Sequence, residues 1–206
     1  MSRSSPPLVL VHGLWDKPSM FNPFIEKLEG YGVSTFAPYL PHDFGRIPIT
    51  SLAKDLDEHI LKRYGKETTI DLFGFSMGGL ISRTWLQKIN GAQRTRRFIS
   101  VGSPHNGTVT AQFVPSSFLP GVADMKRSSE FLKELNNDIS QLKKIDCSSF
   151  YCLMDLMVIP GWQAALPIGR VSALPVLTHK GLIQNPKSIE ILLQEVLMRN
   201  EEDLNV

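Results

Sequence analysis

Apolar residues along this chain fall into short continuous runs and into longer segments in which apolar positions recur every three or four residues. The short runs are typical of buried strands, and the longer segments are typical of helices with one buried face. The two kinds alternate along the sequence. We expect strands at Leu8–Val11, Val33–Ala37, Thr68–Phe73, Arg97–Val101, Ser148–Met154 and Arg170–Ala173.

Helices are predicted between these strands from apolar spacing together with start and stop residues. They run from Ser19 or Asn22 to Gly30, from a cap at Thr50 or Ser51 to Gly65, from the GFSMGG segment to about Asn90, and onward from Asn185–Pro186. Strands that alternate with helices form a parallel sheet with helices on both faces. The sequence therefore predicts an α/β fold with a mostly parallel sheet of about six strands.

Residues 108–146 interrupt this alternation, because they contain no expected strand. They carry an apolar loop with Phe113 and Phe118 and a helical stretch with Phe131 and Leu135. We interpret this segment as an insertion over one end of the sheet. It is either a cap that completes the core or a lid or groove for an apolar substrate. No linker or repeat divides the chain, so residues 1–206 are predicted to form a single domain.

Composition and charge exclude several classes of protein. The two cysteines, Cys147 and Cys152, cannot form a disulfide framework, and no Cys/His cluster suggests zinc. A net charge of +2 gives no basis for nucleic-acid binding. No apolar run is long enough to span a bilayer, and the first one ends before signal-peptide length. We therefore expect a cytoplasmic protein with no cofactor, no metal and no nucleic-acid partner.

The pentapeptide GFSMG, residues 74–78, is the sharpest chemical signal in the sequence. It lies between an expected strand and an apolar helix, which is the setting of a nucleophile elbow. Glycines suit this turn because the chain reverses abruptly and neighbouring segments approach closely. The pattern predicts that Ser76 is a nucleophile rather than a passive turn residue.

A serine hydroxyl is a poor nucleophile alone, so a histidine base and an orienting carboxylate are required. On this arrangement the acid and then the histidine follow the serine, each just past a strand. His179 is the predicted base; His105 is the alternative, although its Gly and Asn neighbours suggest that it holds a loop. Asp155 directly ends the fifth expected strand and is the predicted acid. Asp124 and Asp146, within or at the end of the insertion, are poorly placed for that role.

When a serine nucleophile attacks a carbonyl carbon, the carbonyl oxygen becomes negatively charged and needs two backbone N–H donors. Met77, directly after the nucleophile, is expected to supply one of them. The loop after the first strand contains His12-Gly13-Leu14, and Leu14 is expected to supply the other. Gly13 allows the backbone to approach closely, and His12 is expected to brace this loop.

The segments VLVHGLW, GFSMGGLISR, VGSPHNGT, the strand-ending Asp155 and the segment HKGL at 179–182 occur in one order along the chain. Together they resemble small lipases and esterases of the α/β-hydrolase fold. The resemblance implies that fold and a serine hydrolase without a cofactor. It implies Ser76 as nucleophile, Asp155 as acid and His179 as base, with Leu14 and Met77 forming the oxyanion hole.

The expected function is hydrolysis of lipid-like or acyl esters through an acyl-enzyme on Ser76. An acyltransferase or a thioesterase can use the same site, because water, alcohol and thiol all react with the acyl-enzyme. A binding protein without turnover is a third alternative, against which the intact Ser76, Asp155 and His179 argue. We also expect transient contact with a lipid interface through residues 108–146.

Overall fold

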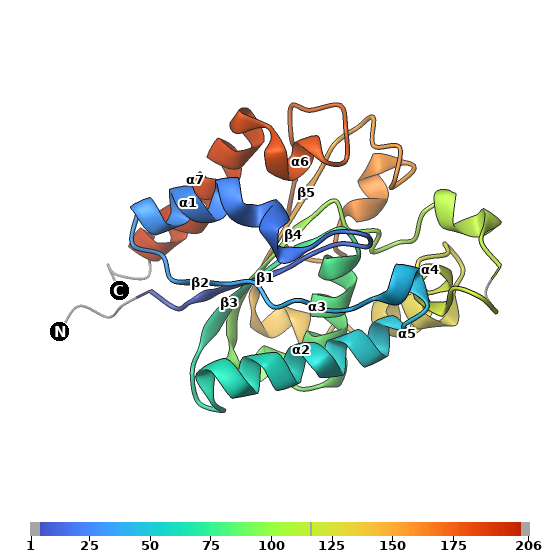
Figure 1. Ribbon diagram of the computed structural model, residues 1–206, viewed down its shortest axis with the longest axis horizontal. Helices are drawn as coiled ribbons and strands as arrows, with labels where there is room; N and C mark the ends of the chain where they lie inside the picture. The colour runs from blue at the N-terminus through green and yellow to red at the C-terminus, as the bar shows by residue number, and fades with distance from the viewer. Residues whose placement is uncertain (1–4, 116, 203–206) are drawn as a thin grey trace.

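The computed structural model describes residues 5–115 and 117–202. Six strands form one parallel sheet in the order β2-β1-β3-β4-β5-β6 (Figure 1). The strands are β1 (Leu8–Val11), β2 (Thr35–Phe36), β3 (Ile70–Phe75), β4 (Thr95–Val101), β5 (Asp146–Tyr151) and β6 (Arg170–Ala173). The predicted fold class and six-stranded parallel sheet are confirmed.

Helices cover both faces of this sheet. α1 and α7 lie over one face, and α2 and α3 lie over the other (Figure 1). The α-helices are α1 (Asn22–Gly30), α2 (Ile49–Tyr64), α3 (Met77–Lys88), α4 (Pro120–Ala123), α5 (Glu130–Asn137), α6 (Gly181–Gln184) and α7 (Pro186–Glu202).

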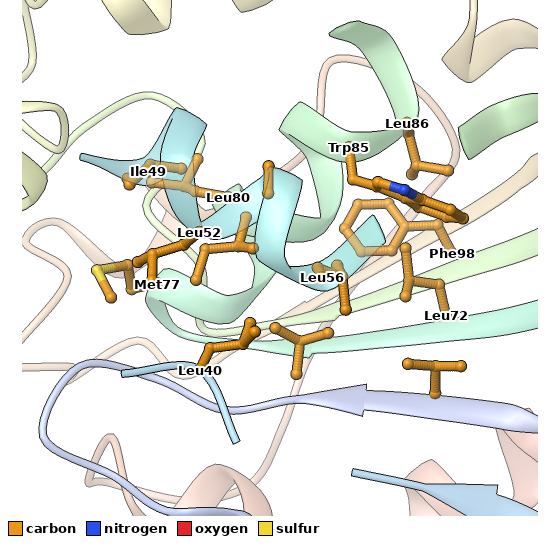
Figure 2. Packing of buried hydrophobic residues seen from close by; sticks show 14 of the residues in the cluster. Leu40, Ile49, Leu52, Leu56, Leu72, Met77, Leu80, Trp85, Leu86 and Phe98 are labelled. Carbon is orange, nitrogen blue, oxygen red and sulfur yellow. The ribbon is translucent and has the colours of Figure 1, made fainter. Parts of the chain in front are cut away.

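The core is divided into two layers because successive side chains of a strand point to opposite faces. In β1, Leu8 and Leu10 pack in the layer of α1 and α7, whereas Val9 and Val11 pack in the layer of α2 and α3. Figure 2 shows the second layer, in which side chains of both helices meet over the sheet. Its labelled members are Leu40, Ile49, Leu52, Leu56, Leu72, Met77, Leu80, Trp85, Leu86 and Phe98.

Two predicted strand boundaries are wrong in ways that affect the site. β3 continues to Phe75, so the strand runs directly into Ser76. β5 ends at Tyr151, and Asp155 therefore does not end the strand directly. The cause is the pairing with β6, which stops where Leu174 N–H donates to the Tyr151 carbonyl at 2.7 Å. A short turn then carries the chain to Asp155.

The start of α2 is capped differently from the prediction. The helix begins at Ile49, with Pro48 at the N-cap, rather than at a Thr50 or Ser51 cap. The backbone N–H of Ile49 instead donates to Asp124 Oδ2 at 3.1 Å. The Asp124 carboxyl group of the insertion thus accepts a hydrogen bond from the first N–H group of α2. The first N–H groups of a helix lack partners within the helix and attract negative charge.

The insertion is held on the body of the fold by a buried arginine. Arg83 of α3 donates from Nη2 to the Leu135 carbonyl and to Asn136 Oδ1, both at 2.8 Å. Its Nη1 donates to the His105 carbonyl at 3.4 Å. Burial lowers the pKa of Arg83 to about 10. Leu132 of α5 belongs to the same core layer as α2 and α3, so this part of the insertion packs against the core.

Neither cysteine is in a disulfide: Cys147 and Cys152 are both free thiols, and both are buried. Burial raises the pKa of Cys147 to about 12 and that of Cys152 to about 11.

Within residues 5–115 and 117–202, no helix is long and apolar enough to cross a membrane.

Candidate active site

Ser76 lies at the junction of β3 and α3 in a strained backbone conformation. Its φ of 53° and ψ of −128° place a residue with a side chain in a region that favours glycine. The Ser76 N–H donates to the Val101 carbonyl at 2.9 Å, which ties this turn to the neighbouring strand β4. The serine is half-buried at the start of a twelve-residue helix, whose positive end faces it.

The loop after β1 is packed directly against this turn. A Cβ atom on Gly78 would overlap the Val11 carbonyl oxygen and lie 2.6 Å from that of His12. A Cβ atom on Gly13 would lie 2.9 Å from Ser76 Cβ. Both positions therefore require glycine. Leu14 and Met77, the two expected oxyanion donors, directly follow Gly13 and Ser76, so the structure brings their segments together beside the serine.

His12 holds the loop after β1 in place. Its Nε2 accepts a hydrogen bond from Leu40 N–H at 3.1 Å, so its proton is on Nδ1, which donates to the Gly13 carbonyl at 3.1 Å. Burial lowers the pKa of His12 and favours the neutral ring. This geometry agrees with the expected bracing role.

Asp155 and His179 form a hydrogen-bonded pair. His179 Nδ1 lies 2.7 Å from Asp155 Oδ2, while Asp155 Oδ1 accepts from the N–H groups of Met157 and Val158 at 2.8 and 3.0 Å. Burial opposes ionisation of Asp155. The hydrogen bond from His179 and the two backbone donors outweigh this effect and hold the pKa of Asp155 below its ordinary value. Asp155 is therefore an ionised carboxylate, and both of its oxygens are hydrogen-bonded.

The other ring nitrogen of His179 is left without a partner. Nε2 is buried and makes no hydrogen bond within the described part of the chain. The ring lies against Phe75, with centroids 4.8 Å apart, which fixes its orientation. Since Nδ1 carries the proton shared with Asp155, Nε2 of the neutral ring is an acceptor. Such a nitrogen is suited to take a proton from a hydroxyl group.

His105, the alternative base, is not brought to Ser76. It is completely buried behind the loop after β4, and its Nε2 lies 2.7 Å from Ser100 Oγ. Burial, reinforced by the charge of Arg83, lowers its pKa well below the ordinary value. Its backbone carbonyl accepts from Arg83. The residue thus holds the loop after β4, as the glycine and asparagine beside it suggest.

Ser76 and His179 open into one cavity of about 620 Å³. One part of the lining, here called the apolar wall, comes from the insertion and from the loop after β5 that carries the predicted acid Asp155 (the acid loop). It is mostly apolar, with Ala111, Val114, Val122, Met125 and Leu156. A second part of the lining, here called the charged wall, comes from the loops that follow β1 and β6 and carries Trp15, Asp16, Leu177, His179 and Lys180. The insertion thus contributes mostly apolar side chains to the lining, and these two loops contribute its charged ones.

Sequence reasoning missed Trp15, Asp16 and Lys180. Trp15 and Asp16 directly follow Leu14, and Lys180 directly follows His179, so each stands within two positions of a predicted site residue. Their place just past a strand end was the available signal, because loops at the carboxyl ends of parallel strands meet at one edge of the sheet.

Two threonines of the insertion fasten it to the acid loop. The hydroxyl groups of Thr108 and Thr110 both donate to the Met157 carbonyl, at 2.9 and 2.7 Å.

Across the described ranges, no group of three His, Cys, Asp or Glu side chains is arranged to hold a metal ion.

Comparison with known proteins places this chain in a family. The family model of palmitoyl protein thioesterases matches residues 7–152, which include the loop after β1 and Ser76 but neither Asp155 nor His179. No curated protein matches the sequence.

Several solved structures share the fold at low sequence identity. The mature form of lipase BlEst2 from Bacillus licheniformis has a TM-score of 0.72 and 20% identity, over 96% of this chain and 92% of the lipase. Aspergillus fumigatus lipase B has a TM-score of 0.76 and 18% identity, over 94% of this chain and 52% of that lipase. The metagenomic carboxyl esterase MGS0156 has a TM-score of 0.69 and 18% identity, over 98% and 77%.

The sheet, the helical layers and the order of motifs thus agree with the resemblance to lipases and esterases of the α/β-hydrolase fold. The family model covers 146 of the 206 residues, from residue 7 to residue 152, which is well over half of the chain. This chain belongs to the palmitoyl protein thioesterase family of α/β-hydrolase-fold hydrolases.

Proposed function

We propose that the protein is a serine hydrolase that cleaves esters of long apolar acyl chains, with Ser76, His179 and Asp155 as its catalytic triad. One observation carries this proposal: Ser76 and His179 line the same cavity, and His179 Nε2 has no hydrogen-bond partner in the described part of the chain, while its Nδ1 lies 2.7 Å from Asp155 Oδ2.

The reaction begins when His179 Nε2 accepts the proton of Ser76 Oγ as that oxygen bonds to the acyl carbon. The electron pair of the carbonyl bond moves to its oxygen, which accepts hydrogen bonds from the N–H groups of Leu14 and Met77. The bond to the leaving group then breaks, and His179 returns the proton to the departing atom. Water repeats these steps on the acyl-enzyme and releases the carboxylic acid.

Asp155 supports this sequence without exchanging a proton. Because the pKa of Asp155 is held low, its carboxylate stays ionised while His179 becomes an imidazolium. The two backbone donors from Met157 and Val158 fix the carboxylate, so the histidine keeps its proton on Nδ1.

The acyl chain is assigned to the apolar wall that the insertion supplies. Each methylene buried there contributes about 0.8 kcal/mol, which favours long chains over acetate. Thioesters are the second candidate substrate, because the matched family is named for a thioesterase activity. Oxygen esters and thioesters of one acyl chain share the acyl-enzyme, so a comparison of their acylation rates separates the two.

Labelling with a fluorophosphonate tests the proposed nucleophile. We expect one covalent adduct per folded molecule, located on Ser76 by peptide mass spectrometry, because the probe needs an activated serine. The variant His179→Gln is expected to label more slowly by about 100-fold or more, since it lacks the base. Ser51→Ala, on the exposed side of α2, is the matched control and should label like the parent. An adduct elsewhere, or none in folded protein, would contradict the assignment.

Four exposed apolar side chains, here called the rim, lie in the same segments as residues that line the cavity. Phe113 is 85% exposed, Phe118 73%, Leu156 75% and Leu177 72%. Contiguous exposed apolar patches commonly mark an interaction surface. We propose that this rim contacts the surface of lipid aggregates that contain the substrate, with the insertion contributing Phe113 and Phe118.

Vesicle binding tests the role of the rim. The double variant Phe113→Ser/Leu156→Ser is expected to bind neutral phosphatidylcholine vesicles about tenfold or more weakly, because two large apolar side chains no longer leave water. Tyr31→Ser, at the end of α1 away from the cavity, is the control; Tyr31 is 64% exposed. Equal losses in co-sedimentation for both variants would show that the rim has no special role.

A further inference from the structure

The charged wall of the cavity holds a tryptophan and a carboxylate side by side. Trp15 and Asp16 both line the cavity, and both come from the loop between β1 and α1. Trp15 has a φ of 65°, a conformation that bulky residues rarely adopt. Strain of this kind persists where the surrounding structure imposes it, and it clusters at functional sites.

Asp16 lies close to the reacting serine. The position that a Cβ atom on Gly13 would occupy is 3.0 Å from Asp16 Oδ2 and 2.9 Å from Ser76 Cβ. The carboxyl group is thus about one methyl group away from the serine side chain. Among the described residues that line the cavity, it is the one carboxylate.

The charge of this carboxylate is incompletely balanced. Burial raises the pKa of Asp16, and the nearby Lys180, His179 and His42 oppose that shift. Lys180 is exposed, and the described residues include no ion pair between it and Asp16. A half-buried carboxylate beside an indole ring therefore faces the cavity without a bound counter-charge.

The leaving group of the substrate is expected near these two loops. His179 Nε2 must return its proton to the departing oxygen, and Asp16 lies near enough to His179 for their charges to interact. The proposed function assigns the acyl chain to the apolar side chains that the insertion contributes to the lining. A group attached to the departing oxygen therefore meets the indole and the carboxylate.

We propose that Trp15 and Asp16 form a leaving-group subsite that favours esters of amino alcohols, in which an alkylammonium group lies two carbons from the ester oxygen. An aromatic face attracts such a cation, and an adjacent carboxylate adds charge attraction. The proposal rests on the proposed function, because it requires attack by Ser76 on an ester.

A matched pair of substrates tests this proposal. The first is a decanoyl ester of choline, and the second is its neutral isostere, in which a tert-butyl group replaces the trimethylammonium group. The measured quantity is the ratio of kcat/KM for the charged ester to kcat/KM for the neutral one, at about pH 8, where a carboxyl group is ionised. The parent protein is expected to favour the charged ester by about tenfold or more.

Substitutions on the charged wall should move this ratio in opposite directions. Asp16→Asn is expected to lower the ratio by about tenfold, and Trp15→Leu by about threefold. Lys180→Gln should raise it, because a competing positive charge is removed. Glu58→Gln, on the exposed side of α2, is the matched control and should leave it unchanged.

The ratio separates a binding role from a structural one. If Asp16→Asn lowers both kcat/KM values in proportion, the residue only shapes the loop after β1, and the proposal is overturned. A parent protein that does not favour the charged ester also overturns it. Persistence of hydrolysis of both esters in Ser76→Ala would instead refute the proposed nucleophile, which is a different failure.

Discussion

Replacing Ser76 by alanine is expected to lower kcat for acyl-ester hydrolysis by about 10⁴-fold or more, without unfolding the protein. The magnitude is taken from serine proteases, in which loss of the nucleophile leaves only the contribution of binding and the oxyanion hole. Alanine and serine have the same difficulty in adopting a φ of 53°, so the elbow should keep its shape. Steady-state hydrolysis of a long-chain nitrophenyl ester measures the loss, and circular dichroism verifies folding.

The control for this substitution is a buried serine of α3, the helix that follows Ser76. Ser82 donates its hydroxyl proton to the Gly78 carbonyl at 2.8 Å and does not line the cavity. Ser82→Ala should retain kcat within a few-fold. Residues that act as a unit are not additive, so Ser76→Ala/His179→Gln should be no slower than Ser76→Ala alone. A Ser76→Ala protein with a tenth of the parent activity would remove Ser76 from the mechanism.

The elements that could be predicted are those specified by local sequence. Leu8–Val11 and Arg170–Ala173 have the predicted bounds, and α1 ends at Gly30 as expected. A continuous apolar run such as LVLV at residues 8–11 and a helix-ending glycine both act over a few residues, so one segment contains the whole signal. The strand at 170–173 is different, because all four of its residues are exposed. The Ser76 turn is of the same kind, because strand, glycines and helix are contiguous in the chain.

The features that could not be predicted depend on contacts between distant segments. The carboxylate of Asp124 caps α2 by accepting from Ile49 N–H, although 75 residues separate them. No local pattern distinguishes this aspartate from a surface one. The same holds for Arg83, whose acceptors at Leu135 and Asn136 lie more than 50 residues away. The predicted cap of α2 at Thr50 or Ser51 is wrong, because the helix begins at Ile49 and its N–H group donates to the distant Asp124 carboxyl group.

The position of Asp155 shows that a wrong strand boundary need not prevent the contact between Asp155 and His179. The strand before it ends earlier than expected, since β6 is short and its pairing with β5 stops at Tyr151. The intervening turn still delivers the carboxylate to His179. What mattered was the order of the acid and the histidine after successive strands, which the topology of a parallel sheet preserves.

Gly78→Ala is expected to lower the free energy of unfolding by about 3 kcal/mol and to slow hydrolysis in the protein that remains folded. An alanine in a helix ordinarily gains about 1 kcal/mol over glycine. Here the added methyl group would overlap the Val11 carbonyl oxygen and lie 2.6 Å from that of His12, and neither backbone group can move without disturbing β1. The overlap outweighs the helix preference.

The same substitution at Gly30 isolates this overlap from the intrinsic effect of glycine. A Cβ atom on Gly30 meets no atom within 4 Å, so Gly30→Ala should be neutral or stabilise by about 0.5 kcal/mol. Urea unfolding of both variants measures the difference.

Gly78→Ala is also expected to affect catalysis. Gly78 is the residue of α3 that contacts the backbone just before Leu14, so we expect the added methyl group to push Met77 and Leu14 apart. Loss of one oxyanion donor costs about 10²-fold in kcat, and a reduction of that size with little change in KM is the expected kinetic result. A Gly78→Ala protein as stable and as active as Gly30→Ala would show that the close approach of these two segments has no bearing on the site.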